Sequence, residues 1–365
     1  MALADCWHAT GAAADATRAL RAVDMAFIMG GPVESLQQLL RTVEPCARAS
    51  LQLQPDAVDA SPTPDATPGP PPTTPLLSGA CPFYFTQGGS CYIPSAIVGQ
   101  RTPEVGLLSD GGRRAEGSHI PRVAAAELSV KEFKKQFFKA DKPVVIQGSM
   151  EGWAALHKWS EPRWWRREHG HRTVPIELGV HAAGSLRERL MTLAEFVDEH
   201  LDRAPAEDDA ARSPAYLAQH TLLDQIPQLM HDVAVPAYCQ AGSHEVTNLW
   251  LGTAATATTL HFDSYDNLLC QVVGHKYVRL YAPAQSGKLY QDQRGHEGMA
   301  TRSQGNLSQV DVGNVDAERF PLFEQAPFLD AVLRPGDVLY IPSCWWHHVR
   351  SAGNVGWWRS IKVQK

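Results

Sequence analysis

Three residues of this chain have the types and the spacing of a mononuclear metal site. His261 and Asp263 stand two positions apart, and His347 lies in a separate segment near the C-terminal end. Side chains at i and i+2 of a strand point to the same face, so one strand would offer an imidazole and a carboxylate together. A second imidazole from a distant strand would complete the ligand set of non-haem Fe(II) oxygenases, which leaves the opposite positions of the metal open.

On its own, the His-x-Asp pair is weak support for a metal. The chain has 15 His and 39 Asp and Glu residues, so a chance pair on a solvated strand edge is the simpler interpretation. The neighbouring segments favour the metal site. Residues 263–281 read as two apolar strands, which we expect to meet in a hairpin at Gly274-His275. In the second strand Lys276, Val278 and Leu280 would share one face.

The rest of the C-terminal region also has the pattern of short strands. Pro335-Gly336-Asp337 predicts a turn, and residues 338–342 predict a strand that ends at a proline. Residues 345–349 follow as another strand. Ser129 is a suitable N-cap for a helix over residues 130–138. Many short strands with few helices predict a mainly β protein with flanking helices, in the double-stranded β-helix form of a cupin-like jelly roll.

Five further segments carry a family pattern in addition to His261, Asp263 and His347. They are residues 174–177, 216–229, 271–283, 308–311 and 326–329. With these segments, the chain from about Pro121 onward resembles the JmjC-domain 2-oxoglutarate oxygenases. Residues 19–30 resemble the end of a helical N-terminal region in that family. The resemblance covers about three quarters of the chain, and it implies a JmjC domain as the catalytic part.

The resemblance implies a set of cofactors and the residues that hold them. His261, Asp263 and His347 would bind Fe(II), with 2-oxoglutarate as the cosubstrate and O2 as the oxidant. The distal carboxylate of 2-oxoglutarate needs a buried cation, because an unpaired buried anion is costly. Lys276 matches that role, and a surface lysine at a strand end is the alternative. By the same match, the other cosubstrate residues would be Tyr216, Thr258 and Asn267, with a bend between Thr258 and His261.

One metal ligand has a rival, and the last strand departs from the family pattern. His348 adjoins His347, but neighbouring strand residues face opposite ways, so only one can bind, and the match favours His347. In the tail, Arg359 and Lys362 stand where the family has apolar residues. Residues 360–363 could still form a strand. The departure leaves open a second interpretation, a catalytically impaired cupin-fold module that binds other proteins.

The resemblance implies oxidation of a protein side chain. The expected reaction is hydroxylation of arginine at C-3 or demethylation of N-methyl-lysine in histone tails, and the motif does not separate the two. The substrate would be a protein or peptide with a cationic side chain, which requires an acidic wall. Glu177 matches a substrate-facing position, and Trp250 could form part of the pocket. A solvated glutamate and a core tryptophan are the alternatives.

Composition argues against several other classes of protein. The net charge of −6 is unfavourable for direct nucleic-acid binding, which needs a basic surface. The 7 Cys residues include no Cys-x-x-Cys, so we expect free thiols in a reducing compartment rather than a zinc ribbon or a disulfide framework. No secretory segment and no apolar run of membrane-spanning length stands out. We expect a protein of the nucleus or the cytoplasm.

The chain divides by composition into three parts. Residues 1–54 form a short helical segment, in which Gly30-Gly31-Pro32 separates two amphipathic helices. These helices are too short to form a core of their own, so they either dock on the main domain or pair with a partner. Residues 55–118 form a Pro-rich, irregular linker. Residues 119–365 form the catalytic domain.

Overall fold

The computed structural model describes residues 13–52, 114–179, 187–202, 214–253, 256–292 and 305–364. The contacts divide the chain into two units. One unit holds residues 1–51 and 110–365, and the other holds residues 52–109. The expected Pro-rich linker lies almost entirely outside the described residues. It therefore stays a prediction, as does the free state of the cysteines within it.

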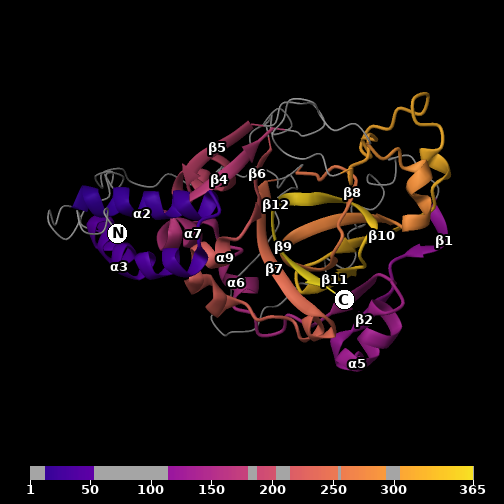
Figure 1. Cartoon of the computed structure of the whole chain (residues 1–365), viewed down its shortest axis with the longest axis horizontal. Coiled ribbons are helices and arrows are strands. Elements are labelled where there is room, and N and C mark those ends of the chain that lie inside the picture. Colours follow the sequence, from indigo (N-terminus) through magenta and orange to yellow (C-terminus); the bar gives the residue numbers. More distant parts are fainter. Residues whose placement is uncertain are drawn as a thin grey trace, which may run out of the picture. The chain divides into compact units, whose positions relative to one another are not determined.

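Two amphipathic helices open the described part of the chain, as the sequence predicts. They are α2 (Ala13–Ile28) and α3 (Val33–Gln52), which lie side by side in Figure 1. Gly30 between them has a φ of +76°, in the left-handed region that glycine adopts without strain. The two helices share an apolar core that includes Phe27 and Leu40.

The helix pair docks on the main domain through a buried cluster of charges. Arg172 has no exposed side-chain surface, and its Nε donates to Oδ1 of Asp24 on α2 over 3.1 Å. The backbone N–H of Thr173 donates to Oδ2 of the same carboxylate over 2.8 Å. Arg48 of α3 donates to the carbonyl oxygen of Glu168, also over 2.8 Å. Docking is therefore the correct one of the two alternatives that the sequence leaves open.

The main domain consists largely of strands. The described strands are β1 (Arg114–His119), β2 (Arg122–Ala124), β3 (Val144–Gln147), β4 (Thr173–Leu178), β5 (Arg187–Thr192), β6 (Ala215–His220), β7 (Ser243–Thr253), β8 (His261–Phe262), β9 (Asp266–Tyr281), β10 (Phe328–Leu333), β11 (Asp337–Ile341) and β12 (Trp346–Gln364). Its described α-helices are α5 (Val130–Phe133), α6 (Ala155–Lys158), α7 (Pro162–His169), α8 (Leu193–Phe196) and α9 (Leu222–Gln225). Across the described ranges, no helix has both the length and the apolar character that crossing a membrane would require.

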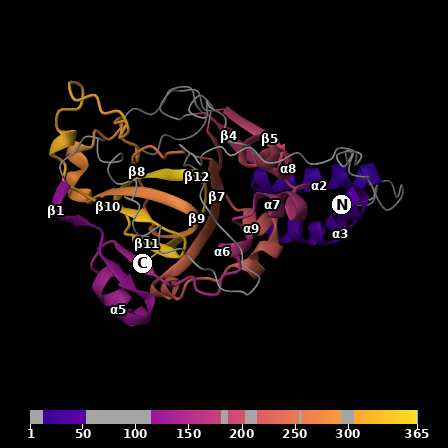
Figure 2. The ribbon, with the colours of Figure 1, turned by 180° about the vertical axis from the view of Figure 1, so that it is seen from behind.

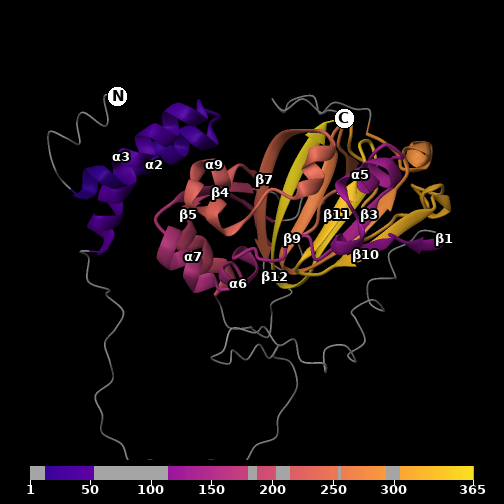
Figure 3. The same cartoon turned by 90° about the horizontal axis from the view of Figure 1, so that it is seen from below.

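The strands join in one sheet that folds over on itself. Its order is β2-β3-β11-β9-β12-β7-β6-β4-β5, with β10 paired to β9 and β1, and β8 paired to β12. β9 and β12 are long and pair with each other along most of their length. The first part of β9 also pairs with β11, and its second part pairs with β10. Both long strands therefore run through two layers (Figure 3), which confirms the predicted cupin-like fold.

Apolar side chains fill the space between the layers and cover one outer face. The interior core combines Leu269 and Val278, from the two parts of β9, with Trp250 of β7. On the outer face of β4, β6 and β7, a second core includes Trp165 of α7 and Phe196 of α8. Figure 2 shows these helices gathered beside those strands.

The predicted N-terminal helix of the main domain is confirmed together with its cap. The Oγ of Ser129 accepts from the backbone N–H of Glu132 over 3.2 Å, and the Glu132 carboxylate reaches back to the N–H of Ser129. The helix continues beyond α5 as a π-helical turn over Lys134–Phe138. This capping box fixes the start of the helix.

One strand boundary predicted from the sequence is wrong. Gly274-His275 is not a hairpin, because β9 runs from Asp266 to Tyr281 without interruption. Gly274 has a φ of +74°, and β12 shifts its register against β9 between Ala352 and Trp357. The glycine therefore bends the strand instead of reversing it. A positive φ suits a bend and a turn equally, so the local pattern did not separate the two.

The C-terminal segment completes the sheet. β12 continues through Gln364 and pairs with both β7 and β9 almost to its end. Residues 360–363 therefore form a strand, although the segment departs from the apolar pattern of the family. The strand places Lys362 opposite Asn267 of β9.

Candidate metal centre

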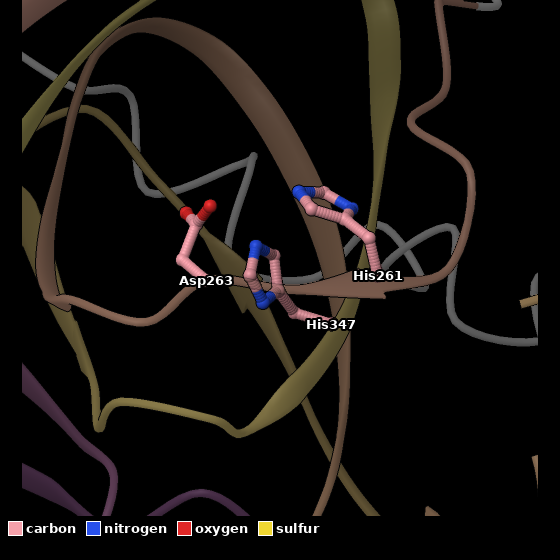
Figure 4. A group of neighbouring side chains, drawn as sticks. All are labelled: His261, Asp263 and His347. Carbon is pink, nitrogen blue, oxygen red and sulfur yellow. The ribbon is translucent and has the colours of Figure 1, made fainter. Parts of the chain in front are cut away.

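His261, Asp263 and His347 come together in the structure. His261 lies on β8, Asp263 follows this strand, and His347 lies opposite His261 on β12. One ligand atom of each residue lies within 4.8 Å of the other two, and the ring centres of the two histidines are 4.2 Å apart. Figure 4 shows the carboxylate and both rings converging. The pairing of β8 with β12 thus brings the distant imidazole to the His-x-Asp pair.

Backbone carbonyl groups fix the orientation of both imidazoles. Nδ1 of His261 is 2.7 Å from the carbonyl oxygen of Thr259, and Nδ1 of His347 is 3.0 Å from that of Trp345. Because a carbonyl oxygen only accepts, each Nδ1 carries the proton and each Nε2 keeps its lone pair. Metal-binding histidines are commonly held in this way. Two imidazole nitrogens and one carboxylate fit Fe(II) or a similar divalent metal.

The shifts in the pKa values of these three side chains favour the binding of a cation. Burial, together with the neighbouring His347, lowers the pKa of His261 to about 4. Burial also lowers the pKa of His347. Burial alone would raise the pKa of Asp263, but His347 and Lys362 outweigh it and hold that pKa below its ordinary value. Near neutral pH the site therefore offers two neutral imidazoles and a carboxylate, as metal binding requires.

Two donors contact the carboxylate of Asp263. Asn267 donates from Nδ2 to Oδ2 over 2.7 Å, and Nζ of Lys362 lies 3.3 Å from Oδ1. The hydroxyl of Ser360 donates to Oδ1 of Asn267 over 2.7 Å, which turns the amide nitrogen toward Asp263. Sequence reasoning missed the contact from Lys362. No local pattern could have found it, because the contact depends on the register of β12 against β9.

His348, the rival ligand, points away from this group. Its Nδ1 is 2.7 Å from the carbonyl oxygen of Thr258. Burial lowers the pKa of His348 to about 4, so this ring is neutral near neutral pH. Within the described ranges, the group with metal-ligand geometry contains His347 and leaves His348 out. The choice of His347 as the ligand stays a prediction, which this geometry supports.

Lys276 is a buried cation beside hydroxyl groups. Only 1% of its surface is exposed. Its Nζ donates to Oγ of Ser351 over 2.9 Å and lies 5.7 Å from the centre of the Tyr216 ring. The Ser351 hydroxyl is also 2.7 Å from that of Thr256. Burial lowers the pKa of Lys276 to about 7. The alternative of a surface lysine is wrong, whereas the role in cosubstrate binding stays a prediction.

Thr258 lies beside β12, in the irregular stretch before β8. Its hydroxyl accepts from the backbone N–H of Val349 over 3.0 Å, and its own N–H donates to the Val349 carbonyl oxygen over 2.9 Å. Thr256 and Ser351, the hydroxyl residues next to Lys276, were missed in the sequence. Ser351 lies two residues from Val349 on β12, so strand alternation is a signal that could have found it, whereas Thr256 lies in the irregular stretch.

Three predicted pocket residues lie on neighbouring strands. Glu177 of β4 pairs in register with Tyr216 of β6. The ring centre of Tyr216 lies 5.5 Å from that of Trp250 on β7. Burial raises the pKa of Glu177, and the carboxylate of Glu188 raises it further. The fold thus places a half-buried acid opposite Tyr216, the aromatic residue that adjoins Lys276, and its contact with a substrate stays a prediction.

Comparisons with known proteins agree with this architecture. Residues 130–362 match the family model described as a cupin-like domain. Lysine-specific demethylase 8 of Xenopus tropicalis is 38% identical over 249 residues, which cover 66% of this chain and 53% of that protein. Lysine-specific demethylase JMJ30 of Arabidopsis thaliana is 38% identical over 243 residues, with coverages of 65% and 54%. Jumonji C domain-containing protein 5 of Drosophila melanogaster is 35% identical over 284 residues, with coverages of 75% and 66%.

The matched region contains the whole candidate site. Residues 130–362 include the three candidate metal ligands, Lys276 and its hydroxyl neighbours. The chain spans about half the length of the Xenopus and Arabidopsis relatives. The resemblance found in the sequence is confirmed, and the chain belongs to the family of cupin-like JmjC-domain proteins.

Proposed function

We propose that this chain is an Fe(II)- and 2-oxoglutarate-dependent oxygenase that oxidises a protein side chain. The observation that carries the proposal is the convergence of His261, Asp263 and His347, which offers two imidazoles and a carboxylate to one metal. The buried Lys276 supports 2-oxoglutarate as the cosubstrate, because it is a cation among hydroxyl groups. The names of two relatives, which are lysine-specific demethylases, point to the same class of protein.

Each site residue has a role in this proposal. His261, Asp263 and His347 would hold Fe(II). With 2-oxoglutarate and O2, the bound metal supplies oxidation of an unactivated C–H bond, coupled to conversion of 2-oxoglutarate into succinate and CO2. Lys276 would pair with the distal carboxylate of 2-oxoglutarate, because a charge-assisted bond offsets the burial of that anion. The residues that would complete the cosubstrate site are Tyr216, Thr258 and Asn267.

The substrate would be a protein or peptide with a cationic side chain. Glu177 would face that side chain, because it is half-buried and adjoins Tyr216, and Trp250 would form part of the wall. The reaction that we favour is hydroxylation of arginine at C-3, with demethylation of N-methyl-lysine as the second possibility. Lysine demethylation is the activity in the names of two relatives. We expect action in the nucleus or cytoplasm without direct contact with nucleic acid or membrane.

A second candidate function is a cupin-fold module that binds other proteins without turnover. The contact between Lys362 and Asp263 favours this candidate, because an ammonium lies beside a carboxylate that the metal needs. The complete ligand set and the buried Lys276 favour the enzyme.

Mass spectrometry of peptides separates these possibilities. The full chain is incubated with Fe(II), 2-oxoglutarate, O2 and peptides that contain arginine or N-methyl-lysine. A gain of about 16 Da on arginine would indicate hydroxylation, and a loss of about 14 Da from N-methyl-lysine would indicate demethylation. If no peptide changes mass and no succinate forms, the binding module is the better description.

A further inference from the structure

Lys362 reaches the metal centre from the far end of the strand that carries His347. It pairs in register with Asn267 of β9 and with Val246 of β7. Because β12 has a neighbour on each side at this point, the backbone of Lys362 is held in place. The side chain is 18% exposed, and its Nζ lies 3.3 Å from Oδ1 of Asp263. The pairing of β12 within the sheet therefore places the ammonium of Lys362 beside the carboxylate of Asp263.

Both carboxylate oxygens of Asp263 have a donor. Oδ2 accepts from Asn267 over 2.7 Å, whereas Oδ1 lies 3.3 Å from the ammonium of Lys362. Ser360 holds the Asn267 amide through a hydrogen bond of 2.7 Å. A metal that binds this carboxylate must therefore share an oxygen with one of the two donors. The contact of Lys362 is the longer and less favourable hydrogen bond, so we expect the metal to compete at Oδ1.

The charge of each donor determines how much it weakens metal binding at the shared carboxylate oxygen. Asn267 is neutral, so its hydrogen bond is compatible with a cation on the same carboxylate. Lys362 carries a positive charge, and like charges repel more strongly as their separation and the local dielectric fall. Its side chain is mostly buried, which limits screening by solvent. The ring of Tyr265, whose centre is 5.7 Å from Nζ, offers a displaced ammonium a second partner.

We propose that Lys362 competes with the metal ion for Asp263 and thereby weakens divalent-metal binding at this centre. The inference rests on the proposed function, because it takes His261, Asp263 and His347 as the ligands. On this inference, the metal affinity of the chain depends on Lys362, a residue of β12. Replacing the ammonium with an uncharged side chain of similar length should therefore tighten metal binding.

Titration of the purified full chain with Mn²⁺ tests this competition. Mn²⁺ suits this donor set, and electron paramagnetic resonance of the free ion reports its concentration. Lys362→Met removes the charge with little change in side-chain length. We expect the Kd of this variant for Mn²⁺ to fall by at least about tenfold relative to the wild type. Lys362→Arg keeps the charge and should bind no more tightly than the wild type. Lys131→Met removes an exposed lysine on α5, and its Kd should stay within about twofold of the wild type.

The possible results separate this inference from the proposed function. Equal Kd values for the wild type and Lys362→Met would overturn the inference alone. Weaker binding in Lys362→Met would also overturn it, because the ammonium would then support the carboxylate. Thermal unfolding without metal shows whether each variant folds, and Lys362→Gln takes the place of Lys362→Met if that variant does not. If neither the wild type nor the uncharged variant binds Mn²⁺, the proposed metal centre fails as well.

Discussion

His347 and Lys362 lie near opposite ends of β12, yet both reach Asp263. A ligand nitrogen of His347 is within 4.8 Å of a carboxylate oxygen, and the ammonium of Lys362 is 3.3 Å from one. The ends of a straight strand of this length would lie far apart. β12 follows β9 past the bend at Gly274 and passes from one layer of the sheet into the other. The bend that the fold requires therefore also brings both ends of the strand to one site.

Replacement of Lys276 tests the cosubstrate pocket. Lys276→Ala should raise the apparent KM for 2-oxoglutarate on the order of tenfold to a hundredfold, because a charge-assisted bond to a buried carboxylate contributes about 1.5–3 kcal/mol. Lys276→Met should have a similar effect while it keeps most of the side-chain volume. Lys131→Met serves as the surface control. Equal titration of 2-oxoglutarate in the wild type and both Lys276 variants would reject this role.

If Lys276 binds the cosubstrate as proposed, its pKa should make that binding depend on pH. Burial lowers this pKa from 10.5 to about 7, so the free pocket loses its cation as the pH rises through that value. A bound carboxylate favours the charged lysine, so binding takes up a proton at higher pH. The Kd for 2-oxoglutarate should therefore rise by up to about tenfold per pH unit above about pH 7. Calorimetry in buffers of different ionisation enthalpy measures the proton uptake, and a Kd that stays constant over this range would contradict the prediction.

Glu177 tests the choice of a cationic substrate. Glu177→Gln should weaken binding of an arginine peptide while 2-oxoglutarate and metal bind as before, because the change removes charge but little volume. Added salt should reduce the difference only modestly, since a half-buried pair is poorly screened. Glu188→Gln, on the neighbouring strand β5, is a useful comparison because this side chain is exposed. Equal peptide affinity in the wild type and Glu177→Gln would place the substrate acid elsewhere.

The buried pair of Asp24 and Arg172 should contribute strongly to stability. Asp24→Ala removes the closer of the two carboxylates beside the buried guanidinium of Arg172, because Glu44 lies 3.5 Å from its Nη1. Breaking a buried pair typically costs about 3–5 kcal/mol. Asp198→Ala removes an exposed partner of Arg166 and should cost no more than about 1 kcal/mol. Urea denaturation of both variants measures the free energies of unfolding. Similar losses in the two variants would show that the pair does not anchor α2 to the main domain.

The features predicted well from the sequence are those that depend on nearby residues. The capping of a helix by Ser129 follows from a pattern of four residues, and the shared face of His261 and Asp263 follows from strand alternation. The family resemblance added His347, which no local rule could have connected to the pair.

The features that the sequence did not predict depend on contacts between distant strands. The bend at Gly274 looks like a turn until β10, β11 and β12 are seen to pair along β9. The hydroxyls next to Lys276 come from two segments far apart in the chain. In the sequence, Lys362 is a charged residue in a strand that is expected to be apolar. Only the register of β12 against Asn267 of β9 shows that it lies beside Asp263.

The most direct test of the central claim is Fe(II)-dependent formation of succinate from 2-oxoglutarate by the wild type and Asp263→Ala. Without its carboxylate, the site keeps two imidazoles and fits a hard divalent ion poorly. We predict that the wild type forms succinate only with Fe(II), and that Asp263→Ala loses both turnover and bound metal while its thermal unfolding stays close to that of the wild type. Unchanged turnover and metal content in Asp263→Ala would contradict the assignment of the metal centre.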